Sequence, residues 1–195
     1  MESEKKRDPA AFVRAGEGLA RLHHAARAGA LRLMYLDESS FGVTPPVRRA
    51  WTPRGMTHAV SATPHGRRLT ALGALELDGP LHYALIRGAA RSADLIGFLD
   101  RLVAEPCTRL TCGVLDNASL HTRYAVAARA STWLIKGLWL HVLPAYSPEL
   151  NPIEILWKHA KPFWRRFVAW QPASLQGEVD RLLQGYDSKF QISFK

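Results

Sequence analysis

Cysteine is nearly absent from this 195-residue sequence, which contains only Cys107 and Cys112. Two cysteines do not form a disulfide framework or a cysteine-based zinc site, and Cys112 lies in an apolar run typical of a buried strand. The sequence also lacks an uncharged apolar stretch of membrane-spanning length, and no signal-peptide core follows its charged first residues. We therefore expect a cytoplasmic protein of a reducing compartment, with no membrane partner.

Acidic residues are also few, because 17 Asp and Glu stand against 26 Lys and Arg, which gives a formal net charge of +9. Such a bias raises the concentration of polyanions near the surface and favours nucleic acid as the partner. Charge alone does not decide this, since basic character also serves solubility. With 47% hydrophobic residues, the chain can build a substantial core as a single compact α/β domain.

The apolar pattern predicts a regular order of strands and helices. Short apolar runs predict strands at 31–36, 110–115 and 138–143. Two extended segments, 68–77 and 81–87, flank Asp78-Gly79, which is typical of a tight β-hairpin turn. Apolar residues spaced three and four apart predict helices over 9–29, 95–103, 123–130, from 152 onward, and around 175–183. The predicted order is an N-terminal helix followed by βββαβαβα and a C-terminal helix.

Two acids directly follow predicted strands, Asp37 after 31–36 and Asp116 after 110–115. Parallel strands joined by crossover helices end at one edge of a sheet, where ligands usually bind. If these two strands are neighbours, their carboxylates converge and repel unless a cation lies between them. Each acid also has a local alternative, because Asp37 can start a turn and Asp116 can cap the next segment.

A third acid, Glu154, stands at the beginning of the helix predicted from Pro152. It follows Asn151 at capping-box spacing, so its carboxylate can instead bond the backbone N–H of Asn151. Three carboxylates with no interleaved histidine select hard cations such as Mg²⁺ or Mn²⁺. Two such ions can activate an attacking hydroxyl and stabilise the leaving oxygen of a phosphodiester. The acids therefore predict a metal site suited to cutting and joining DNA.

The residues around the acids form three longer motifs: YLDES at 35–39, VLDNASLH at 114–121 and LPAYSPELNPIE at 143–154. In this order they resemble bacterial insertion-sequence transposases related to mariner, the insertion sequence 630 group of the DDE superfamily. The resemblance covers about 31–167. It implies a ribonuclease-H-like mixed five-stranded sheet flanked by helices, with an extra N-terminal helix here. The expected division is 1–30 for the N-terminal tail and helix, 31–170 for the catalytic domain, and 171–195 for a C-terminal helix and tail packing on that domain.

By resemblance, Asp37, Asp116 and Glu154 are the catalytic residues and hold two Mg²⁺ or Mn²⁺ ions. Further residues are expected to support the acids or to contact DNA, with surface, capping or ion-pair roles as their ordinary alternatives. They are Trp51, Arg54, Asn117, His121, Lys158, Lys161 and Arg165. Lys158, Lys161 and Arg165 follow Glu154 along one helix, where Pro162 predicts a kink.

Family members generally begin with helix-turn-helix domains that bind transposon ends, and this sequence has no room for them before Leu31. The resemblance implies transposon-end and target DNA as partners, a homodimer, and a separately encoded helix-turn-helix protein as a possible partner. It also implies a bacterial cytoplasm and association with the nucleoid when bound to DNA. Two alternatives stay open, an inactive DNA-binding remnant and a standalone ribonuclease-H-like nuclease.

Overall fold

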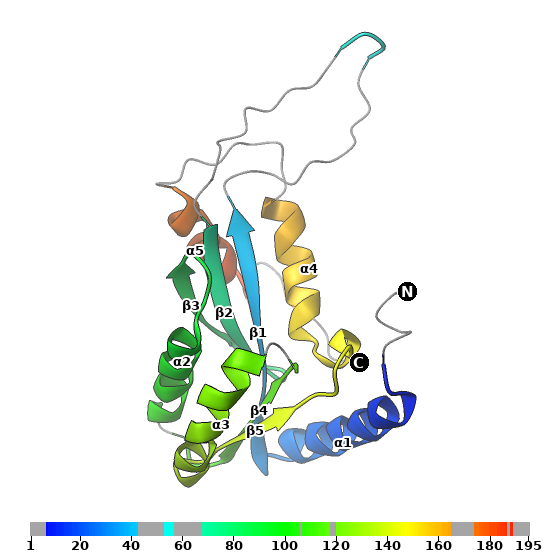
Figure 1. Cartoon of the computed structure of the whole chain (residues 1–195), viewed down its shortest axis with the longest axis vertical. Coiled ribbons are helices and arrows are strands. Elements are labelled where there is room, and N and C mark those ends of the chain that lie inside the picture. The colour runs from blue at the N-terminus through cyan, green and yellow to red at the C-terminus, as the bar shows by residue number, and fades with distance from the viewer. Residues whose placement is uncertain are drawn as a thin grey trace.

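The computed structural model describes residues 7–42, 53–56, 68–105, 107–117, 120–164, 174–186 and 188, without the side chains of 120–123 and 162–164. The strands are β1 (Leu31–Gly42), β2 (Arg68–Glu76), β3 (Leu81–Arg87), β4 (Leu110–Leu115) and β5 (Leu138–Val142). The helices are α1 (Pro9–Arg27), α2 (Ser92–Ala104), α3 (Leu120–Ile135), the short 3₁₀ helix η2 (Pro148–Leu150), α4 (Ile153–Trp164) and α5 (Leu175–Gln184). This is the predicted order (Figure 1).

The strands form one mixed sheet in the order β3-β2-β1-β4-β5. The β1–β2 and β2–β3 pairs are antiparallel, whereas β1–β4 and β4–β5 are parallel, as strands joined by crossover helices should be. The predicted hairpin between β2 and β3 is confirmed, and Asp78 in its turn has a φ of 54°. The first and fourth strands are therefore neighbours, as the argument from the acids required.

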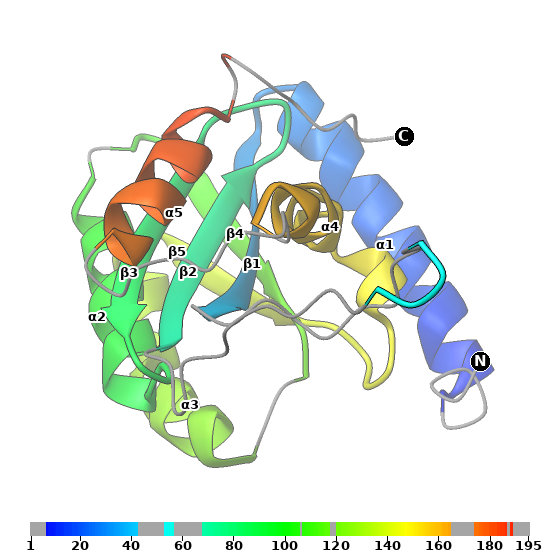
Figure 2. The same cartoon turned by 90° about the horizontal axis from the view of Figure 1, so that it is seen from above.

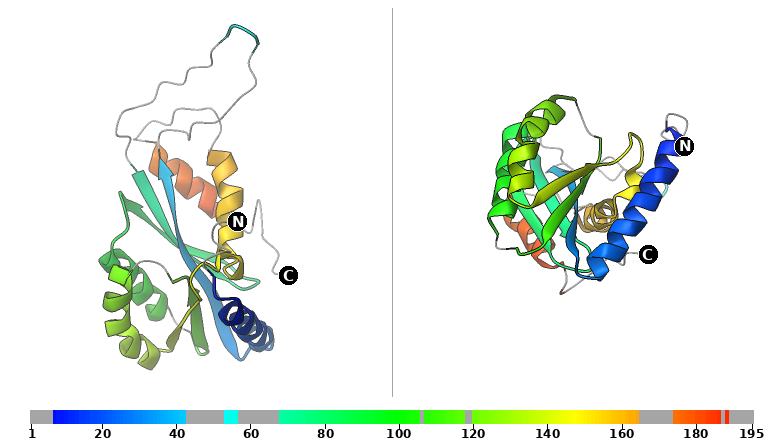
Figure 3. Two further views of the ribbon diagram at one scale, coloured as in Figure 1. Left: turned by 45° about the vertical axis from the view of Figure 1, so that its right-hand side comes forward. Right: turned by 90° about the horizontal axis from the view of Figure 1, so that it is seen from below.

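Helices cover both faces of the sheet, which separates the buried apolar side chains into two cores (Figure 2, Figure 3). On one face, α1, α4 and α5 contribute buried side chains such as Leu19, Trp157 and Leu183. On the other face, α2 and α3 contribute Phe98 and Trp133. The central strand β1 supplies residues to both cores, because alternate side chains of a strand point to opposite faces.

A local hydrogen-bonding signal explains where the first helix starts, and a tertiary hydrogen bond holds α3 against α2. The Asp8 carboxylate accepts hydrogen bonds from the N–H groups of Ala10 and Ala11 at 2.9 and 3.2 Å and so caps α1. Helix α3 is joined to α2 by Trp133, whose indole N–H donates to Asp100 Oδ1 at 2.8 Å. No described helix is long and apolar enough to cross a membrane.

Two predicted boundaries were wrong. Strand β1 does not stop at Leu36 but continues to Gly42, because residues 37–42 pair with β2 beyond the last residue that pairs with β4. Helix α3 spans Leu120–Ile135 rather than 123–130 alone. Pairing and packing with neighbouring elements therefore extended segments that local patterns had ended early.

Candidate active site

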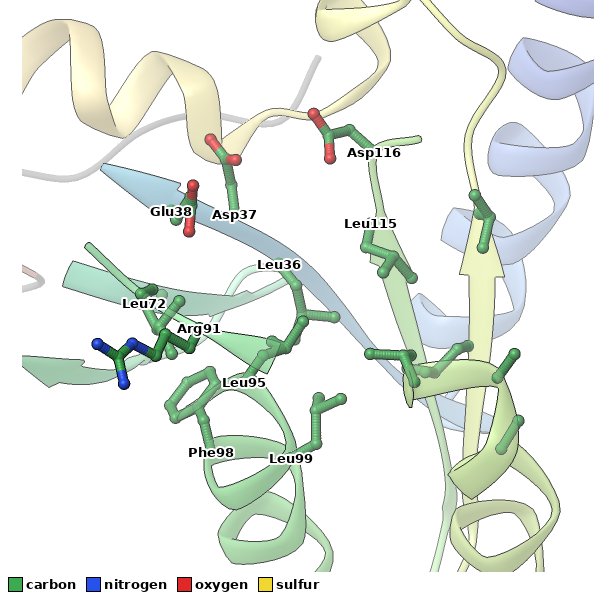
Figure 4. Close-up of a pocket in the computed structure, with 17 residues that line it drawn as sticks. Leu36, Asp37, Glu38, Leu72, Arg91, Leu95, Phe98, Leu99, Leu115 and Asp116 are labelled. Carbon is green, nitrogen blue, oxygen red and sulfur yellow. The ribbon is translucent and has the colours of Figure 1, made fainter. Parts of the chain in front are cut away.

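The two strand-associated acids lie at the same edge of the sheet. Parallel pairing of β1 with β4 ends at Leu36 opposite Leu115, and Asp37 and Asp116 are the next residues of their strands. Figure 4 shows both carboxylates projecting to the same side, beside the segment that leads into α4. Asp37 is half-buried and Asp116 is exposed. The edge thus brings together the two acids that the sequence singled out.

The face on which Asp37 lies follows from the alternation along β1. Asp37 is paired with Gly73 of β2, and a Cβ added to Gly73 would meet the side chains of Ile153 and Trp157 of α4. Directly paired residues of an antiparallel ladder share a face, so Asp37 faces α4. Leu36 and Leu72, one residue earlier in each strand, belong instead to the core under α2 and α3.

Glu154 enters the same region from the first turn of α4 and is partly exposed. The backbone N–H of Asn151 donates to the carbonyl of Pro148 at 3.0 Å, so this N–H has a partner other than the Glu154 carboxylate. Within the described part of the chain, no ion pair joins Glu154 to Lys158. The structure thus gives no support to the two local alternatives for this acid.

Electrostatic coupling ties the three acids together. Burial of the Asp37 carboxyl is the main cause that raises its pKa to about 7 from an ordinary value of 3.8, and the charges of Glu154 and Asp116 raise it further. A hydrogen bond from the Glu38 backbone N–H and the indole N–H of Trp157 act in the opposite direction. Trp157 Nε1 forms no full hydrogen bond with a described residue, so its N–H acts on the Asp37 carboxyl as a nearby dipole.

The donor set of this edge fits a divalent metal. Carboxylate oxygens are the ligands that Mg²⁺ and Mn²⁺ prefer, and a cation would offset the repulsion between Asp37 and its two acidic neighbours. The side-chain oxygens of Asn117, the residue after Asp116, and of Asn151 are buried and have no hydrogen-bond partner among the residues that the structure describes. Among the described residues, no three His, Cys, Asp or Glu side chains are close enough together to form a ready-made metal site. The three acids would therefore have to come closer together to bind one ion.

A pocket of about 600 Å³ opens beside the acids, between the sheet and helices α2 and α3 (Figure 4). Asp37, Glu38 and Asp116 lie at its mouth, and apolar side chains such as Leu72 and Phe98 line its interior.

The remaining residues predicted for the site have different places in the structure. Asn117 directly follows Asp116 at the sheet edge. Arg54 is exposed in a short turn, Lys158 is exposed on α4, and Lys161 is partly exposed on the same helix. Trp51, Arg165 and the side chain of His121 lie outside the described residues. Asn117 thus adjoins Asp116 after β4, and Lys158 and Lys161 lie on the same helix as Glu154. Their contacts with DNA stay predictions.

Two residues that the motif reading did not single out for the site adjoin it. Asn151 is 2% exposed, and its side-chain N–H donates to the carbonyl of Leu36 at 3.0 Å, directly before Asp37. Trp157 is 1% exposed and lies over Gly73. The signal available in the sequence was their spacing, because they stand three residues before and three residues after Glu154.

The raised pKa of Asp37 predicts how the stability of the metal-free protein depends on pH. An acid whose pKa is higher in the folded than in the unfolded state stabilises the fold when protonated, and this contribution is lost as pH rises from about 4 through about 7. We expect the melting temperature of metal-free wild type to fall over this window. Asp37→Asn should remove the part of this fall that Asp37 causes, so its melting temperature at pH 8 should be higher than that of wild type.

Differential scanning fluorimetry of both proteins in chelator, at several pH values from 4 to 8, measures this difference. Glu38→Gln is the matched control, since it removes an adjacent exposed carboxylate. If the melting temperatures of wild type and Asp37→Asn changed with pH by the same amount from pH 4 to 8, this would contradict a raised pKa at Asp37.

Comparisons with known proteins agree with this arrangement. A family model described as "DDE superfamily endonuclease" matches residues 32–174. The chain is similar to the "Mos1 transposase paired-end complex with left transposon end", with 20% identity and a TM-score of 0.62 over 93% of this chain and 57% of that one. It is also similar to the "Crystal structure of the mariner Mos1 paired end complex with Mg", with 19% identity and a TM-score of 0.61 over 94% of this chain and 57% of that one. No curated protein sequence matches.

At this level of identity the similarity shows the fold, which confirms the predicted ribonuclease-H-like arrangement of a mixed five-stranded sheet flanked by helices. The chain spans somewhat more than half the length of the solved chains that it matches.

Proposed function

Because the chain belongs to the DDE superfamily endonucleases, we propose that it is a transposase catalytic domain that cuts DNA strands and joins them to a target. The observation that carries this proposal is the sheet edge, where Asp37 and Asp116 follow the last paired residues of neighbouring parallel strands and Asp37 faces the helix that bears Glu154. Metal-dependent phosphodiester chemistry needs such a group of carboxylates next to an open surface.

In this proposal Asp37, Asp116 and Glu154 hold two Mg²⁺ or Mn²⁺ ions. When bound, the ions activate the attacking oxygen and stabilise the leaving one. The carboxylates of Asp37 and Asp116 approach from adjacent strands and set the place of the scissile phosphate at the sheet edge. Asp37 must lose its proton to act as a ligand, so binding a metal near pH 7 should release a proton to solvent.

Basic side chains near this edge are suited to hold the DNA backbone. Lys158 and Lys161 lie on α4 one and two turns after Glu154, and the net charge of +9 supports binding to a polyanion. We propose that these lysines contact phosphates and that Arg54 does so from its turn. Trp51, His121 and Arg165 stay proposals of the same kind, and Asn117 is proposed to support the carboxylates.

We further propose that the protein acts on transposon ends and target DNA as a homodimer, since two ends must be brought together. A separately encoded helix-turn-helix protein would then supply recognition of the ends. The Mos1 chains that this protein resembles were solved with transposon ends, and one of those complexes with Mg. A bacterial insertion sequence, acting in the cytoplasm at the nucleoid, is the source that the motifs favour.

The proposal is tested by titrating Mn²⁺ into wild type, Asp37→Asn and Asp116→Asn by calorimetry, with and without a duplex taken from the DNA flanking the gene. Binding that is present in wild type and lost in both variants supports the site. The same preparations are then assayed on the flanking duplex, on a shuffled duplex, and on branched or RNA-containing substrates. Preference for branched or RNA-containing substrates points to a standalone nuclease, and DNA binding with no cleavage in any metal points to an inactive remnant.

A further inference from the structure

Helix α4 is attached to the sheet at two points that flank Glu154. Three residues before it, the side-chain N–H of Asn151 donates to the carbonyl of Leu36 at 3.0 Å. Three residues after it, Trp157 packs on Gly73. Glu154 and Trp157 are three apart in α4 and lie on the same side of that helix, whereas Asn151 lies in the extended backbone just before the helix.

The same two attachments also flank Asp37. Leu36 directly precedes Asp37 in β1, and Gly73 is its cross-strand partner in β2. Each attachment thus joins a neighbour of Glu154 to a neighbour of Asp37. The distance between the carboxylates of Glu154 and Asp37 therefore depends on both attachments.

The packing of Trp157 on Gly73 requires that position 73 have no side chain. A Cβ at Gly73 would lie 2.9 Å from Trp157 Cζ2, closer than real Cβ atoms approach, and 3.0 Å from Ile153 Cδ1, which is tighter than most real contacts. Trp157 is held from another direction by Phe41, with ring centroids 6.5 Å apart and an interplanar angle of 76°. Its ring therefore has little freedom to move aside.

The chemistry of Asn151 indicates a role other than packing. Its Oδ1 is buried and has no hydrogen-bond partner among the described residues, which is unfavourable for a side chain that serves packing alone. Trp157 Nε1 is buried and forms no full hydrogen bond with a described residue, although its N–H acts on the Asp37 carboxyl. Both side chains thus place a polar group next to Asp37 or its neighbour Leu36, where an apolar residue would offer none.

We propose that Asn151 and Trp157 are positioning residues that set the distance between Glu154 and Asp37, so that both carboxylates can bind the same metal centre. The inference rests on the proposed function for the identity of that centre. Partners that orient metal ligands typically contribute about 10- to 100-fold to metal affinity or activity.

Asn151→Leu tests the role of the hydrogen bond, because leucine has nearly the shape of asparagine but no donor. We expect Mn²⁺ to bind about 10-fold or more weakly by calorimetry, with a melting temperature close to that of wild type. The Mn²⁺ concentration that gives half-maximal DNA cleavage should rise by a similar factor, and the maximal rate should recover at high Mn²⁺. A role in stability alone would change the melting temperature and leave both metal measurements as in wild type.

Gly73→Ala tests the second attachment without altering a polar group, since the added methyl would overlap Trp157 and force α4 away from β2. The same loss of Mn²⁺ affinity is expected. Leu183→Ala is the control, because it removes a buried core side chain of α5 and should lower the melting temperature with Mn²⁺ affinity unchanged. If wild type binds Mn²⁺ and both Asn151→Leu and Gly73→Ala bind it equally well, the inference is wrong while the site stands. If wild type itself binds no Mn²⁺, the proposed function fails instead.

Discussion

Asp116→Asn is expected to lower Mn²⁺-dependent DNA cleavage by more than about 100-fold, which exceeds the typical effect of losing a partner that only orients a metal ligand. Asparagine keeps the size of the side chain but removes the charge that binds the metal. Asp116 is exposed at the end of β4, so the substitution leaves the core intact. Nicking of supercoiled plasmid DNA over a range of Mn²⁺ concentrations measures the loss, and Asp37→Asn should behave in the same way.

Glu38→Gln is the control for this experiment. Glu38 follows Asp37 in β1 and is exposed, but alternation along the strand directs it to the opposite face of the sheet from α4. Its removal changes the net charge by the same amount and should leave cleavage within a few fold of wild type. Equal activity in Asp116→Asn and Glu38→Gln would overturn the assignment of Asp116 to the catalytic site.

Trp133→Ala is expected to destabilise the protein by about 3–5 kcal/mol, the usual range for removing a large buried aromatic side chain. Trp133 is 0% exposed and is the largest side chain that α3 places in the core under α2. It also joins the two helices through its hydrogen bond to Asp100. Urea denaturation followed by circular dichroism measures the change, and loss of helical signal before the main transition would show that α3 detaches first.

Trp133→Phe separates packing from hydrogen bonding. Phenylalanine keeps most of the ring and loses the N–H donor, so we expect a smaller destabilisation, on the order of 1–2 kcal/mol. If Trp133→Phe were as harmful as Trp133→Ala, the hydrogen bond to Asp100 rather than burial would hold α3 in place. If neither variant were destabilised, the core under α2 and α3 would not depend on Trp133.

The order of elements could be predicted from the sequence because it depends on local signals. The apolar runs of β4 and β5, the Asp78-Gly79 turn and the Asp8 cap each act over a few neighbouring residues. A parallel direction for β1 and β4 was expected because a crossover helix precedes β4. That the two strands are neighbours was only a condition of the argument from the acids, and the structure supplied it.

Other features depended on contacts between residues far apart in the chain. The length of β1 beyond Leu36 is set by pairing with β2, and the sequence near Asp37 did not predict it. The hydrogen bond of Asn151 reaches Leu36 across 115 positions of the sequence. The local capping rule favoured an asparagine that caps α4, whereas tertiary contact placed its side chain on β1.

What the sequence determined by itself is the set of acids, their motifs and the strands and helix that carry them, since these depend on residue type and short spacing. What only the tertiary structure decided is how α4 meets the sheet. That contact depends on the bare surface at Gly73, on the ring of Trp157 that occupies it, and on a buried amide that finds its acceptor on another strand. Shape and burial arise when distant segments pack together, and they bring Glu154 to the face where Asp37 lies.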